Sequence, residues 1–188
     1  TEVRKCAGRV SDLRAICASE KVVSQCGIGH TRWATHGGVN DCNAHPHQVG
    51  KVTLVHNGII ENYRELIADY DLADTLKSET DSEVVAALLN RFYEGNPEEV
   101  IKKTVSKLKG TFALVILFED QKDVIYSTRN VSPIVATICK EGAMLASDLT
   151  ALCRFTNRYF VVPEYHILKL SADKLTLTDF DGNEVLPK

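Results

Sequence analysis

The spacing of the apolar residues changes at Gly110, and this change constrains the fold more than any other feature of the chain. Before it, apolar side chains recur every three or four residues, as in 84–92 and 97–108, which predicts amphipathic helices. After it, short apolar runs alternate with polar turns and predict consecutive strands. Helices and strands that are segregated along a chain favour an α+β fold over an alternating βαβ pattern.

Local signals mark where the helices begin. Thr80 and Glu83 have the spacing of a capping box, in which each side chain satisfies a free backbone N–H of the other residue. Asn96 followed by Pro97 predicts the cap and first turn of the next helix. The remaining helices are expected after Ser11, with Leu13, Ile16 and Cys17 on one face, over Glu61–Tyr70 and, as a short helix, within Asp148–Phe155.

Strands are predicted on both sides of the helical region. A long polar loop, 34–50, separates the first two. The expected strands are Cys26–Trp33, Lys51–His56, Thr111–Phe118, Val124–Thr128, Ile134–Ile138, Ala143–Ala146, Val161–Val162, Tyr165–Leu170 and Lys174–Thr178.

Composition narrows the class of protein. A length of 188 residues suits one domain with a real core. The net charge of −3, without basic clusters, argues against a nucleic-acid surface. No apolar run approaches the ~18 residues of a membrane span, and no apolar leader opens the chain. The six cysteines include no C-x-x-C pair, so we expect reduced thiols and a cytoplasmic location.

One stretch, from Cys26 to Asn57, concentrates the chemically versatile residues. It contains five of the six histidines and the only tryptophan, Trp33. Polar donors are interleaved with glycines, which allow close backbone approach. Such a density indicates a polar pocket, because ligand sites combine a few convergent polar groups.

Three features in or near this stretch have ordinary structural alternatives. Arg32 offers a planar fork of donors for a carboxylate or phosphate, but also suits a structural ion pair. Asp81 is a carboxylate in the first turn of a predicted helix, where the helix dipole stabilises it without any ligand. Asn57-Gly58 could form an oxyanion hole, although Asn-Gly is also a common hairpin turn. On their own, the capping and turn interpretations are favoured for the last two features.

A metal site is the weaker alternative for the histidines. His30, His36, His45, His47 and Cys42 could be assembled into a ligand set, but their spacing matches no zinc pattern with paired short gaps. The chain also contains no G-x-S-x-G elbow, phosphate loop or dinucleotide fingerprint.

Four motifs resemble the glutaminase domain of the glucosamine-6-phosphate synthases. They are H-T-R-W-A-T-H-G (30–37), N-A-H-P-H (43–47), H-N-G-I-I-E-N-Y (56–63) and S-E-T-D-S-E (78–83), in the family's order and spacing. That family is a group of class II glutamine amidotransferases of the N-terminal-nucleophile hydrolase type. The resemblance covers almost the whole chain. It implies a four-layer αββα sandwich without a cofactor or a metal.

The resemblance assigns roles to the ambiguous residues. Arg32 would bind the α-carboxylate of glutamine, and Asp81 its α-ammonium. The Asn57 side chain and the Gly58 N–H would stabilise the oxyanion of the tetrahedral intermediate.

Four further residues are implied at the same pocket. Thr35 and His36 would line it, and His45 would support it. Trp33 would be the gate through which ammonia leaves for a second domain.

The chain departs from the family at its N-terminus. The family's nucleophile is an N-terminal cysteine whose own α-amine serves as the base, whereas this chain begins with Thr1. Cys26-Gly27-Ile28 resembles the family's first tripeptide but lies inside the chain. We therefore expect residues 1–188 to be a truncated type-2 glutamine amidotransferase domain that lacks the first strand or strands of the sandwich and is inactive alone.

The expected partners follow from the same resemblance. The small-molecule partners are L-glutamine and fructose 6-phosphate, the latter bound by sugar-phosphate isomerase domains after residue 188. A second copy is expected in a homodimer of the full-length protein. We expect the chain to bind neither nucleic acid nor a membrane. The alternative function is a non-catalytic module that binds glutamine without hydrolysing it.

Overall fold

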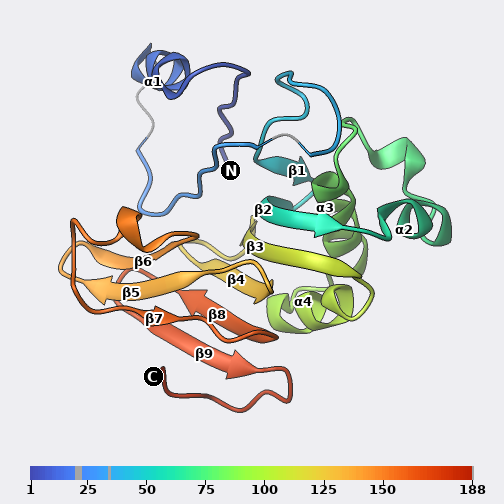
Figure 1. Cartoon of the computed structure of the whole chain (residues 1–188). Helices are drawn as coiled ribbons and strands as arrows, with labels where there is room; N and C mark the ends of the chain where they lie inside the picture. Colours follow the sequence, from blue (N-terminus) through green and yellow to red (C-terminus); the bar gives the residue numbers. More distant parts are fainter. Residues whose placement is uncertain (20–22, 34, 188) are drawn as a thin grey trace.

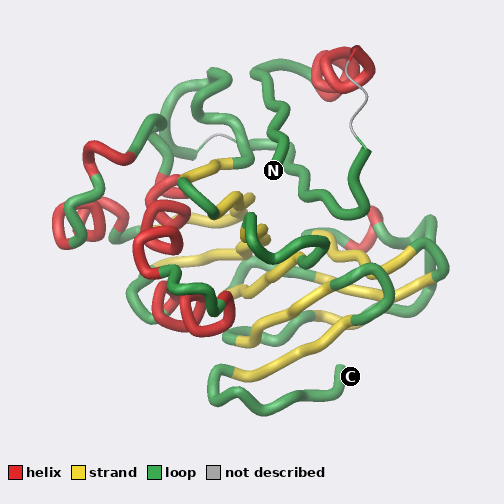
Figure 2. Tube along the Cα trace, turned by 180° about the vertical axis from the view of Figure 1, so that it is seen from behind, coloured by secondary structure: helices red, strands yellow, loops and turns green. Residues whose placement is uncertain are grey.

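Two antiparallel sheets pack against each other, and helices cover the outer face of the larger one (Figure 1). The computed structural model describes residues 1–19, 23–33 and 35–187. The larger sheet has the order β1-β2-β3-β4-β8-β9, and the smaller has the order β6-β5-β7. The predicted α+β class is confirmed. Figure 2 shows the helices of residues 63–105 gathered on one side of the strands, with the N-terminal helix away from them.

The strands of the larger sheet are β1 (His47–Val49), β2 (Val52–Ile60), β3 (Gly110–Phe118), β4 (Ile125–Asn130), β8 (His166–Leu170) and β9 (Leu175–Asp179). The smaller sheet contains β5 (Val135–Cys139), β6 (Gly142–Ala146) and β7 (Phe160–Val161). The helices are α1 (Val10–Ser19), α2 (Tyr63–Asp69), α3 (Asp81–Phe92) and α4 (Pro97–Val105), with 3-10 turns η1 (Ala73–Thr75) and η2 (Leu149–Ala151).

Strand β3 contributes to both hydrophobic cores, because successive side chains of a strand point to opposite faces. Its even-numbered residues Phe112, Leu114, Ile116 and Phe118 belong to the core that the sheet forms with the helices. Ala113 belongs to the second core, which lies between the two sheets. The larger sheet is therefore apolar on both faces.

The start of α3 follows the predicted signal only in part. The Thr80 hydroxyl accepts the Glu83 N–H at 3.3 Å, as a capping residue does. The Glu83 carboxylate, however, accepts the N–H groups of Lys77 and Ser78, at 3.0 and 2.5 Å, rather than the N–H of Thr80. The reciprocal half of the capping box was wrong, and Glu83 instead fastens the loop that leads into α3. At α4, the Asn96 cap is confirmed by its contact with the Glu99 N–H at 3.3 Å.

The N-terminal region differs most from the sequence-based expectation. The strand expected over Cys26–Trp33 is wrong, since this segment is irregular. A strand needs a neighbour for its N–H and C=O groups, and no strand among the described residues pairs with it. The loop expected over 34–50 contains β1.

Two expected helices also differ. Helix α1 begins before Ser11, with Asp12 accepting the Arg9 N–H at 2.7 Å. None of its residues is buried, and it stands apart from both sheets in Figures 1 and 2. The short helix expected in 148–155 is reduced to η2. Within the described ranges, no helix has the length and apolar character needed to cross a membrane.

Candidate functional site

A cavity of about 370 Å³ lies where the second half of β2 meets the N-terminus of α3. It is the place where the four sequence motifs converge. Eight of its lining residues are those named from the sequence: Arg32, Trp33, Thr35, His36, His45, Asn57, Gly58 and Asp81.

Asn43 ties two of the motifs together. Its side-chain N–H donates to the Glu79 carboxylate and to the Gly38 carbonyl, both at 3.0 Å. Its side-chain oxygen accepts the Glu79 N–H at 3.0 Å. Since Asn43 is almost fully buried, these hydrogen bonds fix the 36–38 turn against the segment that leads into α3.

Two histidines attach β1 and β2 to the first turn of α3. His47 Nε2 lies 3.0 Å from the Thr80 hydroxyl, and His56 Nδ1 lies 2.9 Å from the Ser82 hydroxyl. All four side chains are buried. The helix N-terminus is therefore held against the strand that carries Asn57 and Gly58.

Asp81 joins α3 to the edge of β2 and also faces the cavity. Its Oδ2 accepts the Ile60 N–H at 2.8 Å, and its Oδ1 lies 3.9 Å from His36 Nδ1. Only 3% of the residue is exposed. The Oδ2 atom of Asp81 is thus occupied by a hydrogen bond to the backbone of β2, and Oδ1 is available to a cationic ligand in the cavity.

Arg32 is anchored by backbone carbonyls of the following turn. Its guanidinium donates to the carbonyls of His36, Gly37 and Gly38, at 2.9 Å to the last of these. These bonds leave the Nε N–H and one N–H of Nη1 for a ligand. The cavity therefore has a cation, Arg32, and an anion, Asp81, in its wall, which suits the two charged ends of an amino acid.

The Gly58 N–H points out of an uncovered strand edge. Glu61 donates its N–H to Lys109 in the direction of β3, so by strand alternation the N–H groups of Ile60 and Gly58 point to the opposite edge. β1 covers this edge only as far as Leu54. Asp81 takes the Ile60 N–H, and the Gly58 N–H is left for a group in the cavity.

Replacing Gly58 with alanine should destabilise the domain by on the order of 3 kcal/mol or more. Gly58 has a φ of 129°, and an added Cβ would lie 2.1 Å from the Thr111 carbonyl oxygen of β3. Gly27→Ala is the matched control, since its Cβ would meet nothing within 4 Å. Backbone hydrogen exchange of β2 and β3 measures the effect, and equal protection in both variants would contradict it.

Asn57 lies beside Gly58 on the face of β2 that is turned away from α3. Its Oδ1 lies 2.7 Å from His30 Nε2. Because Oδ1 is already engaged, the amide NH2 is the group that remains for a ligand. Asn57 and Gly58 together thus offer two N–H donors to one region, which is the arrangement that an oxyanion hole requires.

The other four predicted residues differ in exposure. Trp33 is 90% exposed and Thr35 is also exposed, so both lie at the rim. His36 is half-buried, with its ring edge against Tyr63 at a centroid distance of 5.3 Å. His45 is only 9% exposed, and neither of its nitrogens has a hydrogen-bond partner among the described residues.

Cysteines and metal ligands do not complete the cavity. None of the described residues that line it is a cysteine, and Cys26 lines a different hollow together with Thr53. In the part of the chain that the structure covers, no group of three or more His, Cys, Asp or Glu residues is arranged to hold a metal ion. His30, His45 and His47 are instead packed ring to ring.

Burial keeps these histidines neutral. It lowers the pKa of His45 to about 2 and that of His47 to about 4, with smaller contributions from neighbouring charges. It also lowers the pKa of His30 and of His56. The His45 ring lies 4.1 Å from the His30 ring and 4.8 Å from the His47 ring, between centroids, so protonating one would place a cation against the others.

Acidification should therefore destabilise the domain. A histidine whose folded pKa lies below its unfolded value of about 6.5 contributes full stability above pH 6.5 and loses it as the pH falls, by about 1.4 kcal/mol per pH unit. We expect reduced hydrogen-exchange protection of β2 at pH 5 relative to pH 7.5. His45→Asn should weaken this pH dependence, and identical protection at both pH values would refute the expectation.

Sequence reasoning gave no separate role to His30, Asn43 or Ser82. His30 had a usable signal, because residues two apart in an extended segment point the same way and His30 stands two before Arg32. For Asn43 and Ser82 the sequence offers no such signal, because their hydrogen-bond partners are remote in the sequence.

Comparison with known proteins places the chain among amidotransferases. A family model described as "Glutamine amidotransferase domain" matches residues 34–154. The chain is similar to the glutamine–fructose-6-phosphate aminotransferase (isomerizing) of Staphylococcus aureus strain Mu50, with 41% identity over 98% of this chain and 31% of that protein. The enzymes of that name from Bacillus licheniformis and Streptococcus pyogenes serotype M1 are 40% and 37% identical over 93% and 99% of this chain. The chain spans 30–32% of the length of these three relatives.

Solved structures share the fold. The glutamine phosphoribosylpyrophosphate amidotransferase from B. subtilis, complexed with ADP and GMP, superposes with a TM-score of 0.68 at 22% identity over 82% of this chain and 35% of that chain. A glutamine aminotransferase class-II domain protein from Silicibacter pomeroyi gives a TM-score of 0.54 at 18% identity over 74% of this chain and 71% of that chain. The N-terminal-nucleophile hydrolase sandwich implied by the sequence motifs is confirmed in its two packed sheets and in the helix layer over the larger sheet.

Proposed function

Because this chain belongs to the glutamine amidotransferase domain family, we propose that it is the glutamine-hydrolysing domain of an enzyme that makes glucosamine 6-phosphate from glutamine and fructose 6-phosphate. The observation that carries the proposal is the convergence of residues from four separate motifs on one cavity. Its opposite charges and its pair of N–H donors match the three polar ends of glutamine: the α-carboxylate, the α-ammonium and the side-chain amide.

The binding step uses the charged wall of the cavity, which is formed by Arg32 and Asp81. Arg32 binds the α-carboxylate through its unused N–H groups, and Asp81 Oδ1 accepts from the α-ammonium. His36 and Thr35 complete the wall on the side of the turn, and buried His45 supports it from behind. Glutamine is thereby oriented with its side-chain amide towards β2.

The chemical step uses the edge of β2. A thiolate adds to the amide carbon, and the resulting oxyanion accepts hydrogen bonds from the Asn57 amide and the Gly58 N–H. Collapse of this intermediate expels ammonia and leaves a thioester, which water hydrolyses to glutamate. The family resemblance assigns the thiol to an N-terminal cysteine, whose α-amine accepts the thiol proton and returns it to the leaving nitrogen as ammonia departs. Exposed Trp33 stands at the rim where ammonia departs.

Activity on the sugar belongs to the same proposal. It is supported by the printed name of the relatives, of whose length this chain spans about a third. We therefore assign fructose 6-phosphate binding to isomerase domains outside residues 1–188. Assembly as a homodimer is proposed from the family resemblance.

The test uses the full-length product of the native gene. We expect it to release glutamate from glutamine and to form glucosamine 6-phosphate when fructose 6-phosphate is added. The 188-residue chain alone should release none, because no cysteine among its described residues lines the cavity. Absence of glutamate release by the full-length protein would overturn the proposal.

A non-catalytic glutamine-binding module is the second candidate. It is favoured by the same observation, a charged cavity without a thiol among the described residues. Calorimetric titration separates the two functions, since saturable glutamine binding by the full-length protein without any release of glutamate would support the module.

A further inference from the structure

The contact between His30 and Asn57 has no place in the roles given above. His30 Nε2 lies 2.7 Å from Asn57 Oδ1. An amide oxygen can only accept a hydrogen bond, so Nε2 bears the proton and donates it. We propose that His30 is a positioning residue that locks the orientation of the Asn57 amide, so that its NH2 group faces the oxyanion. This inference deepens the proposed function and rests on it.

The orientation of this amide decides the sign of its interaction with the substrate. The two ends of an asparagine amide have nearly the same shape, and only one of them donates. In the flipped orientation Oδ1 would face the developing negative charge and repel it. The flipped NH2 would also meet the Nε2–H of His30, donor against donor. The histidine therefore favours the productive orientation twice, by the bond it makes and by the contact it excludes.

The surroundings of His30 keep its ring in place and in one tautomer. The ring is half-buried and lies against the His45 ring, at a centroid distance of 4.1 Å and an interplanar angle of 34°. Its Nδ1 is buried, with no hydrogen-bond partner in the described ranges. Burial lowers the pKa of His30, so a neutral ring with its proton on Nε2 is the favoured form.

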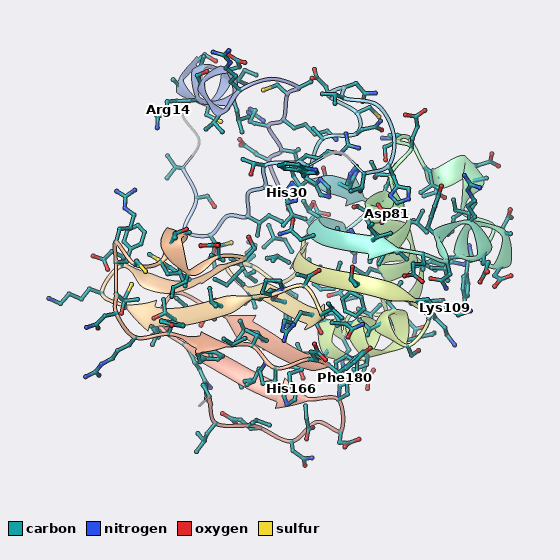
Figure 3. The ribbon with its side chains drawn as sticks, in the orientation of Figure 1. Arg14, His30, Asp81, Lys109, His166 and Phe180 are labelled. Carbon is teal, nitrogen blue, oxygen red and sulfur yellow. The ribbon has the colours of Figure 1, made fainter. Side chains whose placement is uncertain are left out.

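Figure 3 shows where this pair lies relative to the charged wall. His30 is on the N-terminal segment beside β2, and Asp81 is on the side of α3. His166, which bonds the Glu164 carbonyl, is in a different part of the molecule. His30 is thus placed to act on the amide-hydrolysing end of the cavity, and its removal should affect catalysis more than glutamine binding.

The test is a double-mutant cycle on glutamate release by the full-length protein. His30→Leu should lower kcat about 100-fold and change the glutamine KM by less than about threefold. In an Asn57→Ala background the same substitution should lower kcat by less than about twofold, since its only target is gone. Multiplicative losses in the double variant would overturn the proposal. His166→Leu is the control and should leave kcat unchanged.

A second pair of variants distinguishes a positioning role from a loss of activity caused by misfolding. His30→Gln can present an amide N–H near the position of Nε2 and should recover kcat to within about tenfold of the wild type. His30→Asn has the same functional group on a shorter side chain and should not recover it. Equal kcat values for these two variants would contradict a positioning role.

The outcomes distinguish this inference from the proposed function. If the wild-type protein releases no glutamate, the proposed function fails, and neutron crystal structures of the wild type and the His30→Gln and His30→Leu variants, which distinguish the amide NH2 from its oxygen, decide the positioning claim. It stands if the Asn57 amide is reoriented or disordered only in His30→Leu. It fails if the amide keeps one orientation in all three.

Discussion

Asp81→Asn should weaken glutamine recognition by a factor of about 30 to 5,000, the range for removing one partner of a buried charge pair. Asparagine can still accept the Ile60 N–H, which Asp81 Oδ2 now accepts at 2.8 Å, so the link between α3 and β2 is preserved. What is lost is the negative charge opposite the α-ammonium. The glutamine KM for glutamate release by the full-length protein, or a calorimetric Kd, measures this loss.

A substrate lacking the α-amine is the sharpest control for this prediction. The monoamide of glutaric acid has the carboxylate and the amide of glutamine but no ammonium. The wild-type and Asp81→Asn proteins should use it with similar kcat/KM values, because neither has a cation to bind at Asp81. An Asp81→Asn protein that loses as much activity on this analogue as on glutamine would show that Asp81 acts through the fold alone.

Of the two roles of Asp81, only the one at the helix start can be predicted from its own position in the sequence. Its place at the start of a predicted helix is explained by the helix dipole without any ligand. The structure gives its two oxygens different tasks, one bonded to Ile60 and one turned to the cavity. Only the family motifs made the second task predictable, since a carboxylate at this position is otherwise ordinary.

The strand wrongly predicted at Cys26–Trp33 shows a limit of predicting strands from local sequence pattern. Local pattern can identify a segment that is able to be extended, but a strand exists only when a neighbour satisfies its backbone groups. Gly27 and Gly29 add little strand preference of their own. Strands β3 and β4 were predictable because two apolar runs separated by a polar turn pair with each other close in the sequence.

The geometry of Asn57 and Gly58, the two donors proposed for the oxyanion, could not be predicted from the sequence. The direction of the Gly58 N–H depends on the register of β2 with β3 and on β1 ending its pairing at Leu54. The orientation of the Asn57 amide depends on His30, 27 residues earlier. Both are consequences of tertiary placement, whereas the residue types themselves were readable from the motif.

Asn57→Ala should lower kcat for glutamate release by about 100- to 1,000-fold, as removal of one oxyanion donor does in other amide-cleaving sites. In the proposed role, the Asn57 amide would stabilise the transition state, in which negative charge develops on the oxygen, far more than bound glutamine. We therefore expect the glutamine KM to change by less than about threefold. Steady-state kinetics of the full-length protein measures both constants.

Asn57→Asp tests whether kcat depends on the hydrogen-bond donor of Asn57 or only on the shape of its side chain. Aspartate has nearly the volume of asparagine and can still accept the hydrogen bond from His30, but it places a carboxylate oxygen where the amide NH2 was. Its kcat should fall at least as far as that of Asn57→Ala, because repulsion of the oxyanion is added to the loss of a donor. A higher kcat for Asn57→Asp than for Asn57→Ala would mean that Asn57 serves the packing of β2, and the oxyanion assignment would then have to be withdrawn.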